Sequence, residues 1–241
     1  MHARRPRIQT NPSRTHLAHL VDEAAKSVET GSRILDAGSG NGQYASAFAN
    51  HRYCAIDLAS VRQVSFKDLD VVGDLSKLPF ATGSHDLVLC TQVIEHVENP
   101  RQVLAEIFRV LKPNARLWLT APFFYPEHMV PGDFFRYTQY GLASLARGAG
   151  FAIESVRRLE GYAATASLQL LDMARGLPAD WRQYGGGIGG LLVAGGTVIM
   201  RPLFAMMSLL LSRADLGHQI MDRGYCKNYV LIARKPGDKP N

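Results

Sequence analysis

The sequence predicts an α/β fold, a doubly wound parallel sheet with helices on both of its faces. The first observation is the stretch 33–43, where a short apolar run leads into a glycine-rich turn. The second is that further apolar runs, at 53–57 and 86–90, alternate with segments of helical character, as in parallel strands joined by crossover helices. The third is that 46% of the 241 residues are hydrophobic, which is enough to bury a substantial core.

The first element is a helix over 13–27, because Leu17, Leu20 and Val21 recur at helical spacing and Ser13 can cap its start. Each following strand is a short apolar run, and turn or helical segments separate the runs. The expected strands are 33–36, 53–57, 70–73, 86–90 and 116–120; the expected helices are 44–50 and 100–111, with a turn at 112–114.

The turn after the first strand has a spacing that separates two kinds of nucleotide site. Asp36 ends the strand, and Gly38, Gly40 and Gly42 follow at alternate positions. A dinucleotide-binding fingerprint, G-x-G-x-x-G, would place its third glycine at position 43, which is Gln43. Glycine lets a backbone turn tightly against a ligand, and the carboxyl ends of parallel strands are where α/β sheets bind cofactors.

A second acid stands where a ribose would need it. Asp57 ends the second strand, 21 residues after Asp36, and a carboxylate there can accept both hydroxyls of a ribose. A lone Asp at a strand end is more often a turn or helix cap. Its placement relative to the glycine turn favours the binding role.

Motifs further along the chain resemble one family. Residues 36–42 resemble the acidic-x-G-x-G-x-G loop of class I S-adenosylmethionine-dependent methyltransferases. Leu-Pro-Phe at 78–80, Asp-Leu-Val at 86–88, Glu-His-Val at 95–97 and Val-Leu-Lys-Pro at 110–113 resemble the type 11 subgroup. The resemblance is close over 31–122 and weaker through Phe151, with strands at 152–158 and 227–234. It implies a Rossmann-like sheet of seven strands, mostly parallel, with an antiparallel last strand and a helical insertion before it.

The resemblance also implies a cofactor, S-adenosyl-L-methionine, and residues that hold it. Asp36 and the turn with Gly38, Gly40 and Gly42 would hold the methionine end. The ribose would lie at Asp57 and Leu58, the adenine at Asp74 and Leu75, and the sulfonium near Thr91 and Gln92.

Acceptor chemistry would lie beyond strands four and five. If the acceptor is a hydroxyl, His96 or His128 could remove its proton. The segment 122–138 is rich in aromatic residues, and Arg136 could pair with an acidic group on the acceptor. The substrate-binding candidates are Tyr125, Asp133, Arg136 and Tyr137. A structural histidine and an internal Asp133–Arg136 pair are the alternatives.

No metal site is expected. Glu95, His96 and Glu98 are close in sequence, but adjacent side chains such as Glu95 and His96 need not converge on one ion. Cys54, Cys90 and Cys226 have no metal spacing either. Cys54 and Cys90 fall in predicted core strands and are expected to be small buried apolar residues, which fits a reducing cytosol.

The chain divides into an N-terminal tail and cap helix (1–30), a core (31–160), an apolar glycine-rich helical insertion (161–225) and a last strand with a basic tail (226–241). Residues 183–200 carry no charge, and Arg201-Pro202 is expected to interrupt the apolar stretch before 203–212. Each piece is then shorter than the ~20 residues that span a membrane. The alternatives are a soluble cap or homodimer surface, a peripheral membrane contact through 183–212 with Arg201 and Arg213 at the headgroups, or a span.

We therefore expect a methyltransferase acting on a small-molecule or lipid-linked metabolite by in-line transfer, with acceptor and methylated atom open. A catalytically inactive module of the same fold and an NAD-type oxidoreductase are the alternatives, and the glycine spacing counts against the second. The net charge of +6 is moderate and no nucleic-acid motif accompanies it, so no nucleic-acid partner is expected. No apolar run follows the basic N-terminus, so we expect a cytoplasmic protein, peripheral to the membrane if the insertion meets lipid.

Overall fold

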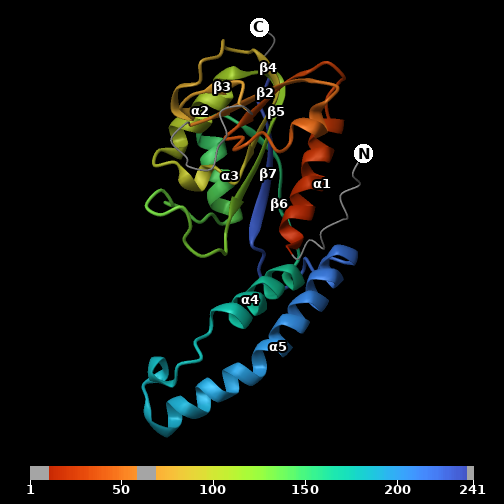
Figure 1. The fold of residues 1–241 in the computed structure, drawn as a ribbon. Coiled ribbons are helices and arrows are strands. Elements are labelled where there is room, and N and C mark those ends of the chain that lie inside the picture. Colours follow the sequence, from red (N-terminus) through yellow and green to blue (C-terminus); the bar gives the residue numbers. More distant parts are fainter. Residues whose placement is uncertain (1–10, 59–68, 238–241) are drawn as a thin grey trace, which may run out of the picture. The chain divides into compact units, whose positions relative to one another are not determined.

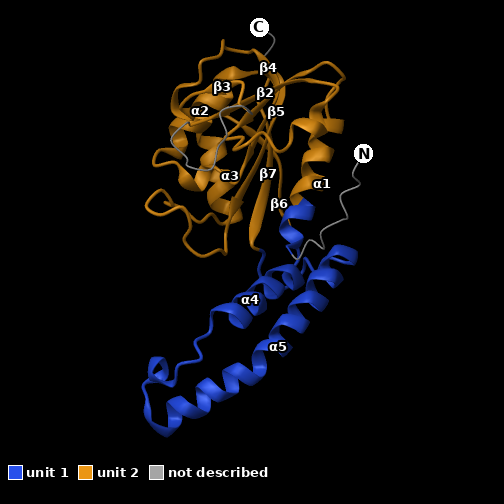
Figure 2. Cartoon of the chain, viewed as in Figure 1, with its two compact units in different colours: residues 1–16, 160–226 blue, residues 17–159, 227–241 orange. Residues whose placement is uncertain are grey.

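The computed structural model describes residues 11–58 and 69–237 (Figure 1). Residues 1–10 and 238–241, which hold parts of the basic tails expected at the two ends, lie outside these residues. The chain forms two compact units, which Figure 2 distinguishes by colour. One comprises residues 17–159 and 227–241, and the other comprises residues 1–16 and 160–226.

The larger unit contains a seven-stranded sheet in the order β3-β2-β1-β4-β5-β7-β6. The strands from β3 to β5 pair in parallel, whereas β7 pairs antiparallel with both β5 and β6. This confirms the predicted Rossmann-like sheet with an antiparallel last strand. The strands are β1 (Arg33–Ala37), β2 (Arg52–Asp57), β3 (Val71–Val72), β4 (His85–Thr91), β5 (Leu111–Pro122), β6 (Ala152–Arg158) and β7 (Asn228–Arg234).

Helices cover both faces of this sheet. Figure 1 shows α1 (Pro12–Lys26) on one side and α2 (Pro100–Val110) and α3 (Gln139–Gly148) on the other. Short 3-10 turns complete the connections: η1 (Ala45–Phe48), η3 (Leu75–Lys77) and η4 (Ile94–His96). Adjacent residues of a strand face opposite sides, and in β4 Leu87, Val88 and Leu89 are all fully buried. Both faces are therefore core.

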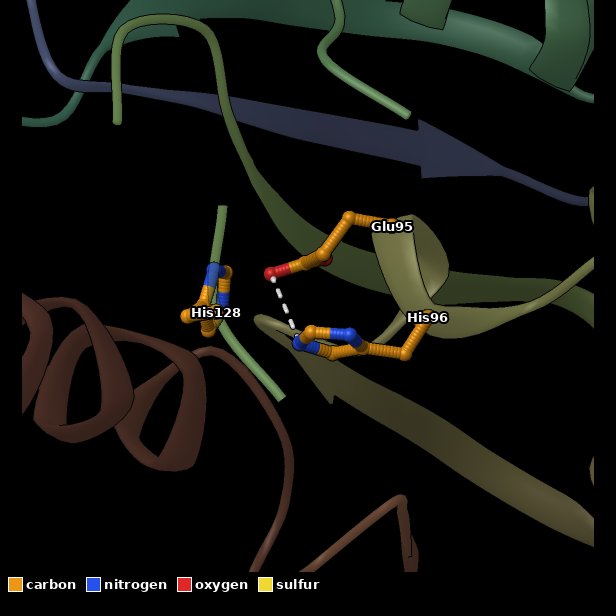
Figure 3. A group of neighbouring side chains, drawn as sticks. All are labelled: Glu95, His96 and His128. Carbon is orange, nitrogen blue, oxygen red and sulfur yellow. Dashed lines mark ion pairs between the residues drawn. The ribbon is translucent and has the colours of Figure 1, made fainter. Parts of the chain in front are cut away.

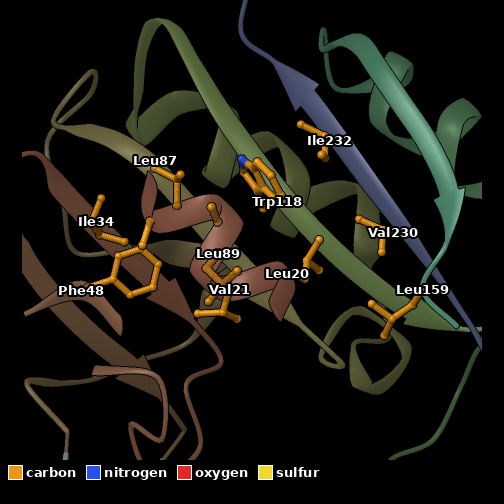
Figure 4. Packing of buried hydrophobic residues seen from close by; sticks show 12 residues of the cluster. Leu20, Val21, Ile34, Phe48, Leu87, Leu89, Trp118, Leu159, Val230 and Ile232 are labelled. Atoms are coloured by element: carbon orange, nitrogen blue, oxygen red, sulfur yellow. The ribbon is translucent and has the colours of Figure 1, made fainter. Parts of the chain in front are cut away.

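One cluster of buried side chains joins α1 to the sheet, as Figure 4 shows. Leu20 and Val21 of α1 pack with Leu87, Leu89 and residues of β5 and β7. Burying one such side chain stabilises the fold by about 1.5–3 kcal/mol. This packing fixes the central strands, and with them the residues at their carboxyl ends.

Two local expectations need correction. The helix expected over 44–50 is only the single 3-10 turn η1. The left-handed glycine turn runs up to residue 42, and 3-10 and turn backbone fill the connection from there to β2 at Arg52. The turn expected at 112–114 lies inside β5, as a bulge where the pairing jumps from His85↔Leu111 to Leu87↔Arg116.

The smaller unit contains two helices, α4 (Tyr162–Gly176) and α5 (Gly187–Gly217), joined through the 3-10 turn η5 (Trp181–Tyr184). The expected interruption at Arg201-Pro202 is wrong, because α5 is one helix of 31 residues with Pro202 inside it. Polar contacts hold the helix on both sides of the proline. Ser208 donates to the carbonyl of Ser167 at 2.6 Å, and Tyr184 contacts Thr197 at 3.4 Å. These contacts, with the packing of α5 on α4 and η5, hold together a helix whose interior proline costs roughly 3 kcal/mol.

Candidate functional site

The glycine turn between β1 and η1 has a backbone that only glycine adopts readily. Gly38, Gly40 and Gly42 have φ angles of +82°, +58° and +67°. A Cβ added at Gly38 would lie 2.4 Å from a methyl group of Val93. The turn therefore requires glycine at position 38 for two reasons: the backbone is left-handed there, and it approaches the segment after β4 closely.

Asp57, at the end of β2, holds this turn. Its carboxylate accepts hydrogen bonds from the backbone amide of Gly40 at 2.7 Å and from that of Leu58 at 2.6 Å. The turn and the end of β2 are thus joined through a group that keeps further acceptor capacity, since a carboxylate can accept about four hydrogen bonds. Leu58 itself is exposed.

Asp36, at the end of β1, is fully buried, and its carboxyl has a strongly raised pKa. Tyr53 of β2 donates a 2.5 Å hydrogen bond to its Oδ2, whereas Oδ1 has no hydrogen-bond partner. Burial raises the pKa of Asp36 to about 7; the Tyr53 hydroxyl opposes this and the charge of Asp57 adds to it. A cationic group bound here would relieve the cost of ionising Asp36.

Tyr53 is a site residue that the sequence analysis did not identify. It precedes Asp57 by four positions on β2, so the strand's alternation places both side chains on one face of the sheet. Its hydroxyl, next to the apolar run 54–56 of β2, was the available signal.

The adenine candidates lie on η3. Asp74 caps this turn by accepting from the backbone amide of Ser76 at 2.8 Å, and Leu75 is buried. At the end of β4, Thr91 is buried and Gln92 has a φ of +56°. Gln92 donates from Nε2 to the hydroxyl of Thr120 at 3.0 Å, which holds its side chain against β5.

The aromatic loop after β5, residues 123–138, is bonded to η4. The amides of Phe134 and Phe135 donate to the carbonyl of Glu95 at 2.8 and 3.2 Å, and His96 Nδ1 donates to the carbonyl of Gly132 at 2.7 Å. The two segments that carry the candidate bases therefore move as one piece.

Both candidate bases are brought together with Glu95, as Figure 3 shows. The rings of His96 and His128 lie edge to face at 4.6 Å, and His96 Nε2 is 3.9 Å from Glu95 Oε1. His128 Nδ1 faces the Asp133 carboxylate at 3.1 Å and the Pro126 carbonyl at 3.3 Å. Because the Nδ1 partners of both histidines are acceptors, Nδ1 carries the proton and Nε2 offers its lone pair.

Glu95 is fully buried and neither of its carboxylate oxygens has a hydrogen-bond partner. Burial raises its pKa to about 8, and burial also lowers the pKa of His128. One ligand atom from each of Glu95, His96 and His128 lies within 4.8 Å of the others, so the three could hold a metal ion. The expectation that no metal is needed remains a prediction, which calorimetry with Mg²⁺ and Zn²⁺ tests.

The four substrate-binding candidates differ in their hydrogen-bond partners and in their exposure to solvent. Arg136 is paired with the buried Asp133 through both guanidinium nitrogens, at 2.7 and 2.6 Å, and it also donates to the carbonyls of Tyr125 and Pro126. This pairing holds the pKa of Asp133 well below its usual range. Tyr137 is buried and donates to the carbonyl of Ile94 at 3.3 Å, whereas Tyr125 is exposed.

The sheet order, the glycine turn and the acids at the ends of β1 and β2 are the features expected above from the resemblance to class I methyltransferases. Residues 35–119 match a family model described as a methyltransferase domain.

Proteins of similar sequence are methyltransferases by name. The demethylmenaquinone methyltransferase of Paenarthrobacter aurescens (strain TC1) is 33% identical over 128 residues, 50% of this chain and 49% of the relative. The ubiquinone biosynthesis O-methyltransferase of Xanthomonas oryzae pv. oryzae (strain PXO99A) is 29% identical over 172 residues, 63% of this chain and 69% of the relative. The chain thus spans about half the length of the demethylmenaquinone methyltransferase that it matches.

A solved structure shares the fold. The 1,6-didemethyltoxoflavin-N1-methyltransferase of Burkholderia thailandensis, with bound 1,6-didemethyltoxoflavin and S-adenosylhomocysteine, superposes with a TM-score of 0.56 at 16% identity. The match covers 95% of this chain and 80% of that one. At this identity the likeness concerns the fold alone.

Proposed function

We propose that the chain is an S-adenosylmethionine-dependent methyltransferase acting on a small-molecule or lipid-linked acceptor. The observation that carries the proposal is the joined set at the carboxyl edge of the sheet: a buried acid, a left-handed glycine turn and a second acid bonded to that turn. The family relatives, which act in quinone biosynthesis by name, support an acceptor of metabolite size.

The residues fit the cofactor's charges. Asp36 has one buried oxygen without a hydrogen-bond partner, and its raised pKa is what a missing cationic neighbour would produce. Asp36 and the amides of the glycine turn would hold the methionine end, and Asp57 would hold the ribose through its free lone pairs. The bound cofactor supplies a methyl group on a positively charged sulfur, activated for attack by a nucleophile.

The chain's own task is then to align the acceptor and remove its proton. Orientation of two reactants can contribute several kcal/mol to lowering a barrier. Phe124, Tyr125, Phe134 and Phe135 are exposed on the loop that is bonded to η4, and they offer an apolar surface for an acceptor. His96 Nε2 and His128 Nε2 carry lone pairs beside it, and burial lowers the pKa of His128, which favours its neutral form.

The test has two arms. Calorimetry should detect binding of S-adenosylmethionine and of S-adenosylhomocysteine, and no binding of NAD. Transfer of a labelled methyl group to cell extract, separated into lipid and aqueous fractions, should label one fraction. Binding without transfer to any fraction would indicate an inactive module of the same fold, and binding of NAD in place of both nucleosides would refute the assignment.

A further inference from the structure

The long helix α5 of the smaller unit buries small or polar residues and exposes large apolar ones, the opposite of a usual surface helix. Its buried positions are small or polar: Gly190, Ala194, Ser208, Ser212 and Asp215. A Cβ at Gly190 would lie 2.5 Å from the carbonyl oxygen of Trp181, so this face is closely packed. Its exposed positions are large and apolar, with Ile188, Leu192 and Ile199 being 80, 72 and 75% exposed.

Six of the twelve exposed large apolar residues of α5 form one stripe along the helix, and the other six lie on its two flanks: Leu191, Val193, Val198, Met200, Met207 and Leu216. The spacing of the stripe residues, three, four or seven, places them on a single side, opposite the face that packs on α4 and η5. The stripe consists of Ile188, Leu192, Ile199, Leu203, Met206 and Leu210. At 1.5 Å per residue the stripe extends over about 33 Å.

Several polar groups of α5 lie away from this stripe. Arg201 donates to the carbonyl of Leu177, and Ser208 donates to that of Ser167, both on the packed face. Asp215 accepts from the amide of Ala164 at 3.2 Å and from His16 at 2.8 Å. The helix therefore has one packed face that carries these polar groups and one apolar face in contact with solvent.

The charged residues of 181–214 are of one sign: Arg182, Arg201 and Arg213, with no carboxylate. Arg201 belongs to the packed face, whereas Arg213 is exposed and lies beside the stripe. Basic residues beside an apolar helical face are attracted to the anionic headgroups of a bilayer. The helix is long and apolar enough to cross a membrane by length and composition, with a mean hydropathy of 1.6. A crossing helix would meet lipid around most of its circumference, whereas the polar face of α5 is already packed within its own unit.

We propose that α5 lies in the plane of an anionic bilayer surface, with this stripe embedded at the boundary of headgroups and acyl chains. The proposal concerns the smaller unit and is independent of the methyltransferase activity.

The experiment compares two double variants of the full chain in flotation with vesicles of phosphatidylcholine and phosphatidylglycerol. The stripe variant is Leu192→Gln with Ile199→Gln. The matched control is Val193→Gln with Met200→Gln, which changes the exposed neighbours on the flank of the helix and lowers its apolar content comparably. We expect the stripe variant to lose vesicle binding about tenfold or more and the control to bind like the unaltered chain. Circular dichroism verifies that both remain folded.

Other outcomes overturn the proposal. An equal loss in both variants, with resistance to carbonate extraction, would indicate a helix that spans the bilayer. A stripe variant that turns a dimer into a monomer in size-exclusion chromatography, with no vesicle binding by the unaltered chain, would indicate contact with a second copy. Equal vesicle binding by the unaltered chain, the stripe variant and the control variant would show that the stripe does not contact the bilayer.

Discussion

Removing the Tyr53 hydroxyl should shift the pH dependence of cofactor binding. Tyr53→Phe keeps the ring that stacks on Phe48 at 5.6 Å and deletes the 2.5 Å hydrogen bond to Asp36. A hydrogen bond to a charged group contributes about 1.5–3 kcal/mol. Since each pKa unit corresponds to about 1.4 kcal/mol, ionisation of Asp36 should require a pH about one to two units higher.

The sign follows from the charge of the ligand. A cationic ligand prefers ionised Asp36, so its affinity should rise as pH passes the Asp36 pKa of about 7. In Tyr53→Phe the rise should move upward, which lowers affinity at neutral pH by on the order of tenfold and leaves it nearly unchanged at about pH 10.

The assay is calorimetry with S-adenosylmethionine across this pH range. Tyr140→Phe is the matched control, because it deletes a hydroxyl from a tyrosine that is 77% exposed. A merely structural defect in Tyr53→Phe would lower affinity at every pH. A profile with an unchanged midpoint would refute the coupling between Tyr53 and Asp36.

Three further changes test the rest of the site. Gly38→Ala should weaken cofactor binding and destabilise the fold more than Gly83→Ala, because both positions have positive φ but only Gly38 would also meet Val93; urea unfolding and calorimetry measure the difference. Asp57→Ala should lower affinity for S-adenosylmethionine roughly tenfold or more by removing the ribose acceptor, and unchanged affinity in a folded protein would contradict the site. Glu95→Gln should raise the free energy of unfolding at alkaline pH. With its folded pKa raised to about 8, the carboxyl contributes stability at low pH that is lost as pH rises through that value. A difference from the unaltered chain that fails to grow between about pH 6 and about pH 9 would show that Glu95 ionises freely.

Most of the sheet could be predicted because its signals are local. Apolar runs ending in Asp36 and Asp57, and the spacing of Gly38, Gly40 and Gly42, depend on neighbours in the chain. The 3-10 turn η1 and the bulge in β5 could not be predicted from the sequence. Both depend on how the neighbouring strands pair in the tertiary structure.

The sequence by itself determined the parallel sheet, the glycine turn and the acids at the strand ends, because side-chain alternation and backbone freedom are properties of neighbouring residues. Only the tertiary structure decided which side chains meet. It paired Tyr53 with Asp36, brought His128 to His96 and Glu95 across more than thirty residues, and committed Arg136 to Asp133. It also decided that α5 continues through Pro202, because contacts with α4 and η5 on both sides of the proline hold a helix that local propensity would end.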